Sequence, residues 1–357
     1  MIVIDGSYGE GGGQVLRTSL ALAAITGQPV RIERIRAGRR KPGLQPQHLT
    51  AARAVAKICD ADVEGGKLDS QTLSFAPRST PKAGTYTFDV SLAAKGGSAG
   101  AVSLILQTVL LPLALAAGTS QLTLVGGTHV AWSPPFDYIK RVYLPTLARM
   151  GIRAKVNLEK WGWYPLGGGI VKATVEGAAG SQDLCGLDLA QRGKLQRVRG
   201  LSASSNLPKQ IRGRQAGTVL QVLRSAGLNP RVDEIDAPSK GQGTAVFLWV
   251  ECDNALAGFT ALGERGKPAE QVAEEAARDL LAYLKSQAAL DRHLADQLVL
   301  PLALALAGGP SHLATETVTQ HLLTVAWVVD QFLPGRVQVE GTEGQPGACH
   351  IGEDEAS

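Results

Sequence analysis

Three stretches of this 357-residue chain resemble one another, and a repeated unit constrains an architecture more than any single motif does. Each stretch opens with a glutamine, continues as an apolar run that ends in Ala or Gly, and leads into a short β-like segment. The three stretches span residues 14–27, 107–118 and 297–308. A glutamine at the start of an apolar helix must find a polar partner or face a site. The three repeated glutamines are therefore unusual polar positions that need such an explanation.

The order of strand-like and helix-like patterns predicts three repeated units and one insertion. The units are expected at residues 1–93, 94–189 and 286–345, each with two helices on a four-stranded sheet, and together they form one large domain. Residues 190–285 differ in character and are expected to form a smaller α/β domain inserted at a surface connection. Residues 346–357 are expected to be a loose tail. The alternation of strands and helices places the chain in the α/β (α+β) class.

Composition indicates a soluble protein of a reducing cytoplasm. The chain is 44% apolar and 19% charged, which is ordinary for a globular protein. Its four cysteines lie far apart, without the spacing of a zinc site or a disulfide framework, and no signal-peptide pattern precedes the first strand. Residues 96–130 carry no Asp, Glu, Lys or Arg, but Gln107, Pro112 and a break at Gly118 favour a buried helix over a membrane span. The sequence does not distinguish a monomer from a homodimer.

A basic run lies between the first repeat and the next predicted helix. Its members, opposed only by Glu33, are Arg31, Arg34, Arg36, Arg39, Arg40 and Lys41. One interpretation is a solvated strand edge and loop. The other is a phosphate-binding lip, which fits a polyanionic partner.

A glycine-rich loop, Asp5-Gly-Ser-Tyr-Gly-Glu-Gly-Gly-Gly-Gln14, joins the first strand to the first helix. Phosphate-binding loops occur at such junctions. The loop has neither the Walker A pattern nor GxGxxG, so a plain tight turn is the alternative. Glu10 within the loop can reach a metal ion, and Arg17, one turn into the following helix, can reach a phosphate.

Three further positions are candidates for a site. His321 lies within a predicted helix, where it is either a satisfied core histidine or a neutral imidazole able to attack phosphorus. His48 follows Gln47 at a helix start and is either a helix-end polar group or part of a site. Asp296 and Gln297 open the third apolar helix, as an N-terminal cap or facing a pocket. These patterns alone do not identify a reaction.

Taken together, the motifs resemble those of the RNA 3′-terminal phosphate cyclase family. The similar segments run in family order from residue 1 to about residue 340, at residues 5–14, 35–43, 47–49, 106–110, 162–169, 295–298 and 319–324. The Gly-x-x-Pro-x-Gly-Gly-Gly segment at 162–169 and the His321 segment are the most specific of them. The family fold has three similar α/β units and one inserted smaller domain. Because His321 is retained, the resemblance is to the cyclases proper and not to their non-catalytic branch.

The resemblance implies an ATP-dependent reaction on RNA. A histidine, by its position in the motif His321, attacks the α-phosphorus of ATP to give histidyl-AMP and pyrophosphate. The adenylate passes to an RNA 3′-phosphate, giving RNA(3′)pp(5′)A. The neighbouring 2′-hydroxyl then forms a 2′,3′-cyclic phosphate and AMP leaves. A divalent metal, Mg²⁺ or Mn²⁺, is expected to offset the triphosphate charge.

The resemblance also implies roles for individual residues. Glu10 is the expected metal ligand, and a nucleotide pocket is implied for Arg17, Gln107, Pro134, His293, Leu294, Ala295, Asp296 and Gln297. The RNA end and its phosphate are assigned to Arg36, Arg39, Gln47 and His48. Three positions depart from the family pattern, since His293, Val325 and Trp161 stand where Tyr, Asn and a basic residue are common.

Two other functions are compatible with parts of the pattern. One is a non-catalytic relative that binds RNA or a ribosome-assembly partner, a branch that lacks the nucleophilic histidine. The other is an enolpyruvyl transferase, whose repeats are similar in kind and which forms no protein–AMP bond.

Overall fold

The computed structural model describes residues 1–93, 98–178, 180, 184–305 and 309–352. Its sheets are mixed and carry helices on their faces, so the predicted α/β class is confirmed. The described part contains no helix with both the length and the apolar character needed to cross a membrane.

The first sheet has the strand order β1-β2-β4-β3. Its strands are β1 (Ile2–Asp5), β2 (Val30–Glu33), β3 (Asp62–Glu64) and β4 (Leu73–Ala76). Two helices connect them, α1 (Gly13–Thr26) and α2 (Pro46–Cys59). Strand β2 runs parallel to β1 and antiparallel to β4, and β3 runs antiparallel to β4.

The second sheet repeats this order as β5-β6-β8-β7, with the same directions of pairing. Its strands are β5 (Thr85–Asp89), β6 (Ala117–Gly126), β7 (Arg153–Lys160) and β8 (Gly169–Ala178). A short 3₁₀ turn, η1 (Val90–Ala93), precedes α3 (Val102–Ala114). A second helical run combines α4 (Phe136–Tyr138), the π-helical turn η2 (Ile139–Tyr143) and α5 (Leu144–Ala148).

The third sheet, β9-β14-β16-β15, has the same order and directions again. Its strands are β9 (Asp188–Leu189), β14 (Ser311–Thr315), β15 (Val337–Glu340) and β16 (Gly347–Ile351). Its helices are α8 (Leu294–Ala303) and α9 (Gln320–Phe332). Because β9 precedes the insertion and β14 follows it, the insertion interrupts the connection between the first strand and the first helix of this unit.

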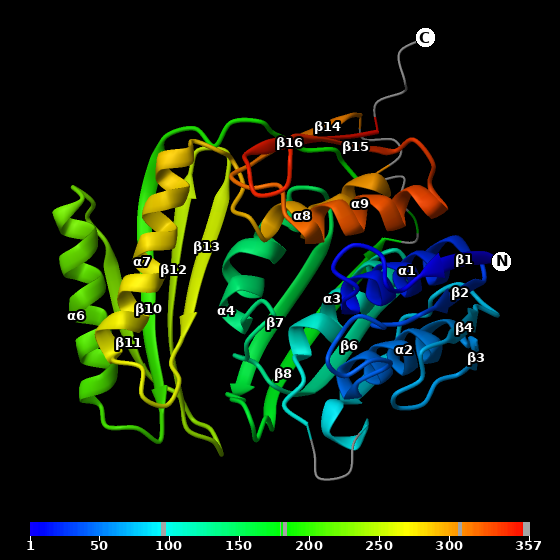
Figure 1. Ribbon diagram of the computed structural model, residues 1–357, viewed down its shortest axis with the longest axis horizontal. Helices are drawn as coiled ribbons and strands as arrows, with labels where there is room; N and C mark the ends of the chain where they lie inside the picture. Colours follow the sequence, from blue (N-terminus) through cyan, green and yellow to red (C-terminus); the bar gives the residue numbers. More distant parts are fainter. Residues whose placement is uncertain (94–97, 179, 181–183, 306–308, 353–357) are drawn as a thin grey trace.

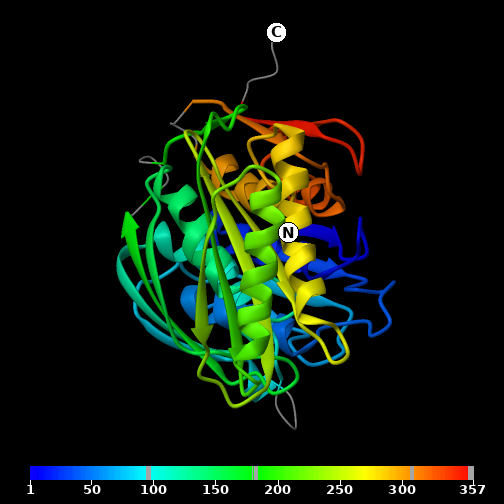
Figure 2. The same cartoon turned by 90° about the vertical axis from the view of Figure 1, so that its left-hand side faces the viewer.

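The inserted sheet has the order β11-β10-β12-β13. Its elements are β10 (Leu195–Ser205), α6 (Gln210–Ser225), β11 (Arg231–Asp236), β12 (Gly243–Cys252), β13 (Leu256–Leu262) and α7 (Ala269–Ser286). Figure 2 shows α6 and α7 lying over the outer face of this sheet. The opposite face turns toward the second unit, where Phe247 and Trp249 join the main hydrophobic core.

Helices of different units pack against one another at the centre, and the sheets lie outside them. Helix α1 contacts α2, α3 and α9, and α8 contacts α9. In Figure 1 the third sheet lies above α8 and α9, with the first unit beside them and the insertion at the opposite end. Helix α3 is buried on nearly every side, which explains why its sequence carries no charge over such a length.

Two predicted boundaries are wrong. Strand β5 (Thr85–Asp89) pairs with β6, so the second unit begins near residue 84 and not at residue 94. Residues 347–351 form β16 between β14 and β15, so the predicted tail from residue 346 contains a central strand of the third sheet. Both errors concern short strands whose partners lie far along the chain, and local pattern does not identify those partners.

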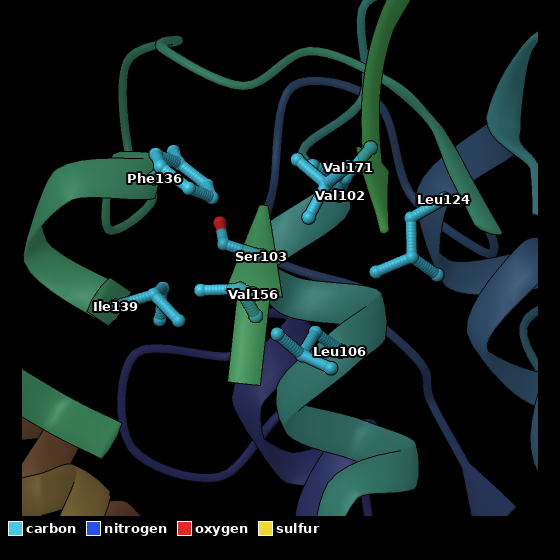
Figure 3. A pocket seen from close by; sticks show the side chains of 8 residues that line it. All are labelled: Val102, Ser103, Leu106, Leu124, Phe136, Ile139, Val156 and Val171. Carbon is cyan, nitrogen blue, oxygen red and sulfur yellow. The ribbon is translucent and has the colours of Figure 1, made fainter. Parts of the chain in front are cut away.

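A small cavity of about 10 Å³ lies in the core of the second unit. Figure 3 shows that its wall is apolar except for Ser103, with side chains from α3, the second sheet and the α4–η2 run. A space of this size holds at most one water molecule and offers it few polar partners. We interpret it as a packing defect.

Candidate functional site

A cavity of about 1100 Å³ lies where the glycine-rich loop, helices α1, α3, α8 and α9, and the inserted domain meet. Twelve residues predicted for the site line it: Glu10, Arg17, Arg36, Arg39, Gln47, His48, Gln107, Pro134, His293, Asp296, Gln297 and His321. The other two, Leu294 and Ala295, are buried in the hydrophobic core. The structure therefore brings residues from positions 10 to 321 of the chain to one cavity.

The glycines of the glycine-rich loop allow its backbone to lie very close to α9 and to the Glu10 side chain. Gly9 has φ +60°, and a Cβ there would lie 2.3 Å from Thr324 Oγ1 on α9. A Cβ at Gly12 would lie 2.1 Å from Glu10 Oε1. Side chains at these two positions would displace the carboxylate or separate the loop from α9.

An aromatic stack fixes the same loop to α9. The rings of Tyr8 and Trp327 are 3.9 Å apart between centroids, with an interplanar angle of 14°. Trp327 lies on the helix that carries His321. The stack and the Gly9 contact therefore hold Glu10 and His321 in a fixed relation.

His321 lies in the first turn of α9 beside a carboxylate. Thr319 caps the helix, since its side chain accepts a hydrogen bond from the Leu322 N–H at 3.1 Å. His321 Nδ1 lies 3.2 Å from Glu10 Oε1, and the other Glu10 oxygen accepts a hydrogen bond from Arg39 Nη2 at 3.0 Å. Nδ1 is buried while 45% of the side chain is exposed. The cavity therefore meets the opposite edge of the ring, which carries Nε2.

The surroundings favour a neutral His321. Burial lowers the pKa of His321 below its ordinary value, and the charges of Arg17 and Arg39 lower it further, whereas Glu10 opposes them. A neutral imidazole has a lone pair on one nitrogen, and a carboxylate beside Nδ1 favours the tautomer with its proton there. Of the two interpretations for His321, an accessible nucleophile agrees with this geometry and a sealed core histidine does not.

Three guanidinium groups supply positive charge to the cavity. Burial lowers the pKa of Arg17 to about 10, so this side chain is still a cation at neutral pH, and it donates a hydrogen bond to Gln14 Oε1 at 2.7 Å. Arg36 sits at φ 54°, and its Nη1 donates to the Lys41 carbonyl at 2.7 Å. Together with Arg39, these side chains give the cavity wall positively charged N–H donors of the kind that bind phosphate.

The basic run divides between two environments. Arg31 pairs with Glu33 at 2.7 Å and Arg34 pairs with Asp5 at 3.2 Å. Arg36 and Arg39 line the cavity instead. The strand-edge interpretation thus fits Arg31 and Arg34, and phosphate binding stays a prediction for Arg36 and Arg39.

His48 and Gln47 also connect elements around the cavity. The backbone N–H of Gln45 donates to His48 Nδ1 at 3.1 Å, which caps α2. Burial, with the charges of Arg17 and Arg36, lowers the pKa of His48 to about 3, so this ring is neutral. Gln47 Oε1 accepts from the Ala101 N–H at 3.2 Å. His48 thus combines the helix-end role with a place on the cavity wall.

The two repeat-equivalent glutamines meet. Gln107 Nε2 donates to Gln297 Oε1 at 2.6 Å, and Gln297 Nε2 donates to the His293 carbonyl at 2.6 Å. The Leu294 N–H is bound by Asp291 Oδ1 at 3.0 Å, so Asp291 and not Asp296 serves the start of α8. Burial and the neighbouring Asp291 raise the pKa of Asp296 to about 8, which makes it a hydrogen-bond donor at neutral pH.

A buried network behind the 126–135 loop was missed by the sequence analysis. His129 lies between Thr128 Oγ1, 2.9 Å from Nδ1, and Asp137 Oδ2, 3.1 Å from Nε2. Its ring stacks on Trp161 at a centroid distance of 4.0 Å. Trp161, which stands where the family commonly has a basic residue, thus packs against His129. An isolated histidine, aspartate and tryptophan gave no spacing signal that could have identified this group.

The insertion forms one wall of the cavity, and the sequence analysis did not predict this. Residues 258–262 of β13 and Lys267, Glu275 and Asp279 line the cavity. Arg292, which follows the insertion, pairs with Glu316 at 3.1 Å. The inserted domain is therefore part of the site.

Among the described residues, no group of three or more His, Cys, Asp or Glu side chains is arranged to hold a metal ion. Mg²⁺ commonly takes one or two carboxylates and completes its shell with phosphate oxygens and water. Glu10, on the cavity wall beside the three arginines, fits such a single-carboxylate ligand.

Comparison with known proteins gives one consistent result. The sequence profile of a family described as "RNA 3'-terminal phosphate cyclase" matches residues 8–339. A relative of that name from Methylococcus capsulatus is 53% identical over 98% of this chain and 99% of its own length. Another from Trichormus variabilis is 52% identical over 96% and 97%, and one from Methanopyrus kandleri is 43% identical over 98% of each chain.

Proposed function

Because the chain belongs to the RNA 3′-terminal phosphate cyclase family, we propose that it uses ATP to convert an RNA 3′-phosphate into a 2′,3′-cyclic phosphate. The observation that carries this proposal is His321, which reaches the large cavity beside Glu10 and three arginines. We also propose a reducing, cytoplasmic setting, which agrees with Cys59 and Cys349 as buried thiols.

The first step forms a bond between protein and nucleotide. Nε2 of His321 attacks the α-phosphorus of ATP, a P–N bond forms, and the bond from that phosphorus to the bridging oxygen breaks to release pyrophosphate. The Glu10 carboxylate, 3.2 Å from Nδ1 without a hydrogen bond between them, is proposed to favour the tautomer that carries its proton on Nδ1 and its lone pair on Nε2. The guanidinium groups of Arg17, Arg36 and Arg39 stabilise the negative charge of the phosphates.

The second step transfers the adenylate to RNA. An oxygen of the RNA 3′-phosphate attacks the same phosphorus, the P–N bond breaks, and RNA(3′)pp(5′)A forms. This step changes a poor leaving group on the RNA phosphate into AMP. Arg36, Arg39, Gln47 and His48 are proposed to hold the RNA end, since they line the cavity near the nucleophile.

The third step closes the ring. The 2′-hydroxyl loses its proton and attacks the 3′-phosphorus, and the bond from that phosphorus to the AMP oxygen breaks. The ribose already holds the 2′-oxygen beside the phosphorus, so this step gains from intramolecular proximity. Catalysis in two covalent stages divides one difficult substitution into easier ones.

The same cavity holds the residues proposed to bind the nucleotide and the metal ion. Gln107, Pro134, His293, Asp296 and Gln297 are proposed to surround adenine and ribose, with a protonated Asp296 able to donate a hydrogen bond. Glu10 is proposed to hold Mg²⁺ or Mn²⁺, which supplies charge neutralisation at the phosphates when bound.

The decisive experiment is covalent labelling with α-³²P-ATP and Mg²⁺ or Mn²⁺. We expect a protein–AMP adduct that is labile in acid and stable in base, as a phosphoramidate is. His321→Asn and His321→Ala should lose the label and the cyclisation of a 3′-phosphorylated RNA, while circular dichroism stays unchanged.

The alternatives give different outcomes. A non-catalytic RNA-binding relative or an enolpyruvyl transferase would give no label in the unmodified chain. A label that persists in both His321 variants would move the nucleophile to another residue and contradict the proposal.

A further inference from the structure

One aromatic side chain on the cavity wall has no structural role that its contacts explain. Trp132 lies in the loop between β6 and α4, lines the large cavity, and is 98% exposed. The chain has five tryptophans. Trp161, Trp163 and Trp249 are buried, and Trp327 is half-buried in its stack with Tyr8. A large indole left in water at a cavity mouth costs hydration free energy that a ligand can recover.

The backbone at Trp132 is held in an unusual conformation. Its φ is +63°, in the left-handed region that a bulky side chain rarely adopts. Such strain persists only where the surroundings enforce it, and it concentrates at functional sites. The backbone that carries the exposed ring is therefore held in place at the cavity wall.

The loop around Trp132 is anchored on both sides. The Thr128 N–H donates to the Gly162 carbonyl at 2.9 Å, and the next residue, His129, lies 3.1 Å from Asp137 Oδ2. Ser133 Oγ donates to the Val130 carbonyl at 3.0 Å, and Pro134 and Pro135 follow. An anchored loop loses little conformational entropy when its aromatic side chain binds a flat ligand.

The arginines of the cavity indicate what kind of ligand would stack on Trp132. Arg36 and Arg39 line the same cavity and suit a terminal phosphate. A single strand of RNA that brings its phosphate to them also brings unpaired bases. Proteins bind such strands by stacking bases on aromatic rings beside cationic groups.

We propose that Trp132 is a stacking platform for a nucleobase near the 3′ end of a single-stranded RNA. This inference rests on the proposed function and adds the way in which the strand is held. The adenine of ATP is the less suitable occupant, because its proposed partners include the buried Asp296, whereas the ring of Trp132 is almost wholly open.

The test compares Trp132→Ala and Trp132→Phe in the full chain with a short 3′-phosphorylated RNA. Trp132→Ala should raise the KM for RNA by about 5- to 150-fold, since one stacked base contributes about 1–3 kcal/mol. Trp132→Phe should retain most of the affinity, and protein–AMP formation from ATP without RNA should be unchanged. Tyr164→Leu is the matched control, because Tyr164 is an aromatic residue 78% exposed outside the cavity wall, and it should behave as the unmodified chain.

An abasic series identifies the contact. Removing the base at the stacking position should weaken binding to the unmodified chain, and Trp132→Ala should add little to that loss. Binding of the same RNA should also quench tryptophan fluorescence in the unmodified chain and much less in Trp132→Phe.

The outcomes separate this inference from the proposed function. If the unmodified chain forms no protein–AMP, the proposed cyclase function is contradicted. The role of Trp132 can then still be decided, because RNA binding is measured independently by tryptophan fluorescence. An unchanged KM and an unchanged quench in Trp132→Ala would overturn the inference. A rise in the KM for ATP alone would overturn it too, since the ring would then serve the nucleotide.

Discussion

At the scale of single residues, the site depends on one carboxylate between two basic groups. Glu10 lies 3.2 Å from His321 Nδ1 and 3.0 Å from Arg39 Nη2. The motif resemblance predicted these three residues. It could not predict the buried His129, because only the fold brings the ring of Trp161 and the carbonyl of Gly162 against it.

The pKa of His321 should respond in opposite directions to its two neighbours. Histidine NMR of the nucleotide-free chain is expected to give a pKa below 6.5. Glu10→Gln removes a negative charge that favours the imidazolium and should lower this pKa further. Arg39→Met removes a positive charge and should raise it. Since only the neutral ring attacks phosphorus, the acid limb of adenylation should move with the measured value; shifts of the same sign in both variants would contradict the geometry.

At the scale of elements, the repeat predicted the helices well and the short strands poorly. Helices α1, α3 and α8 have long apolar runs, whose period is visible in the sequence. Strands β9 and β16 are short, and each pairs with β14 across a large sequence separation. Local pattern does not encode such pairing, so the third sheet could be completed only from the structure.

The stack between the glycine-rich loop and α9 should be measurable by a double-mutant cycle. Tyr8→Ala and Trp327→Ala should each slow adenylation, because the loop that carries Glu10 loses its support on the helix that carries His321. The coupling free energy of unfolding between them should be about 0.5–1.5 kcal/mol. Trp327→Phe should restore part of the rate. Strictly additive effects on both stability and rate would show that the stack does not position the loop.

A pair of glycines tests how the insertion is attached. A Cβ at Gly243 would lie 2.1 Å from the ring of Trp163, which donates from Nε1 to Ser205 Oγ at 2.6 Å. Gly243→Ala should therefore destabilise the chain by about 1–3 kcal/mol in urea unfolding. The matched substitution Gly217→Ala is on an exposed position of α6 with open space around it. It should stabilise by about 0.5–1 kcal/mol, because alanine favours a helix over glycine.

At the scale of the whole molecule, one face of the inserted sheet joins the core of the repeats, and the other face forms a second core with α6 and α7. Leu201, Ala203, Phe247 and Trp249 of the inserted sheet pack with the second unit, and Arg141 lies 4.9 Å from the ring centroid of Trp249. The sequence indicated a separate domain because its composition changes near residue 190. Composition does not reveal that both faces of the inserted sheet are covered.

Thermal unfolding of the full chain should accordingly occur in one transition. The calorimetric and van't Hoff enthalpies should agree, since the insertion cannot open without exposing the shared core. ATP at 100 times its Kd should stabilise the folded chain by about 2.7 kcal/mol in that same transition. A separate low-temperature transition assigned to residues of α6 and α7 would mean that the insertion unfolds independently.

The central strand of the third sheet is also its last, and this has a consequence for biosynthesis. Helix α9 packs beneath a sheet that lacks its middle member until residues 347–351 have left the ribosome. Glu10 is translated long before β16, yet the sheet above the helix of its partner His321 is complete only once β16 has been made. A chain that ends before β16 is therefore expected to form no protein–AMP adduct.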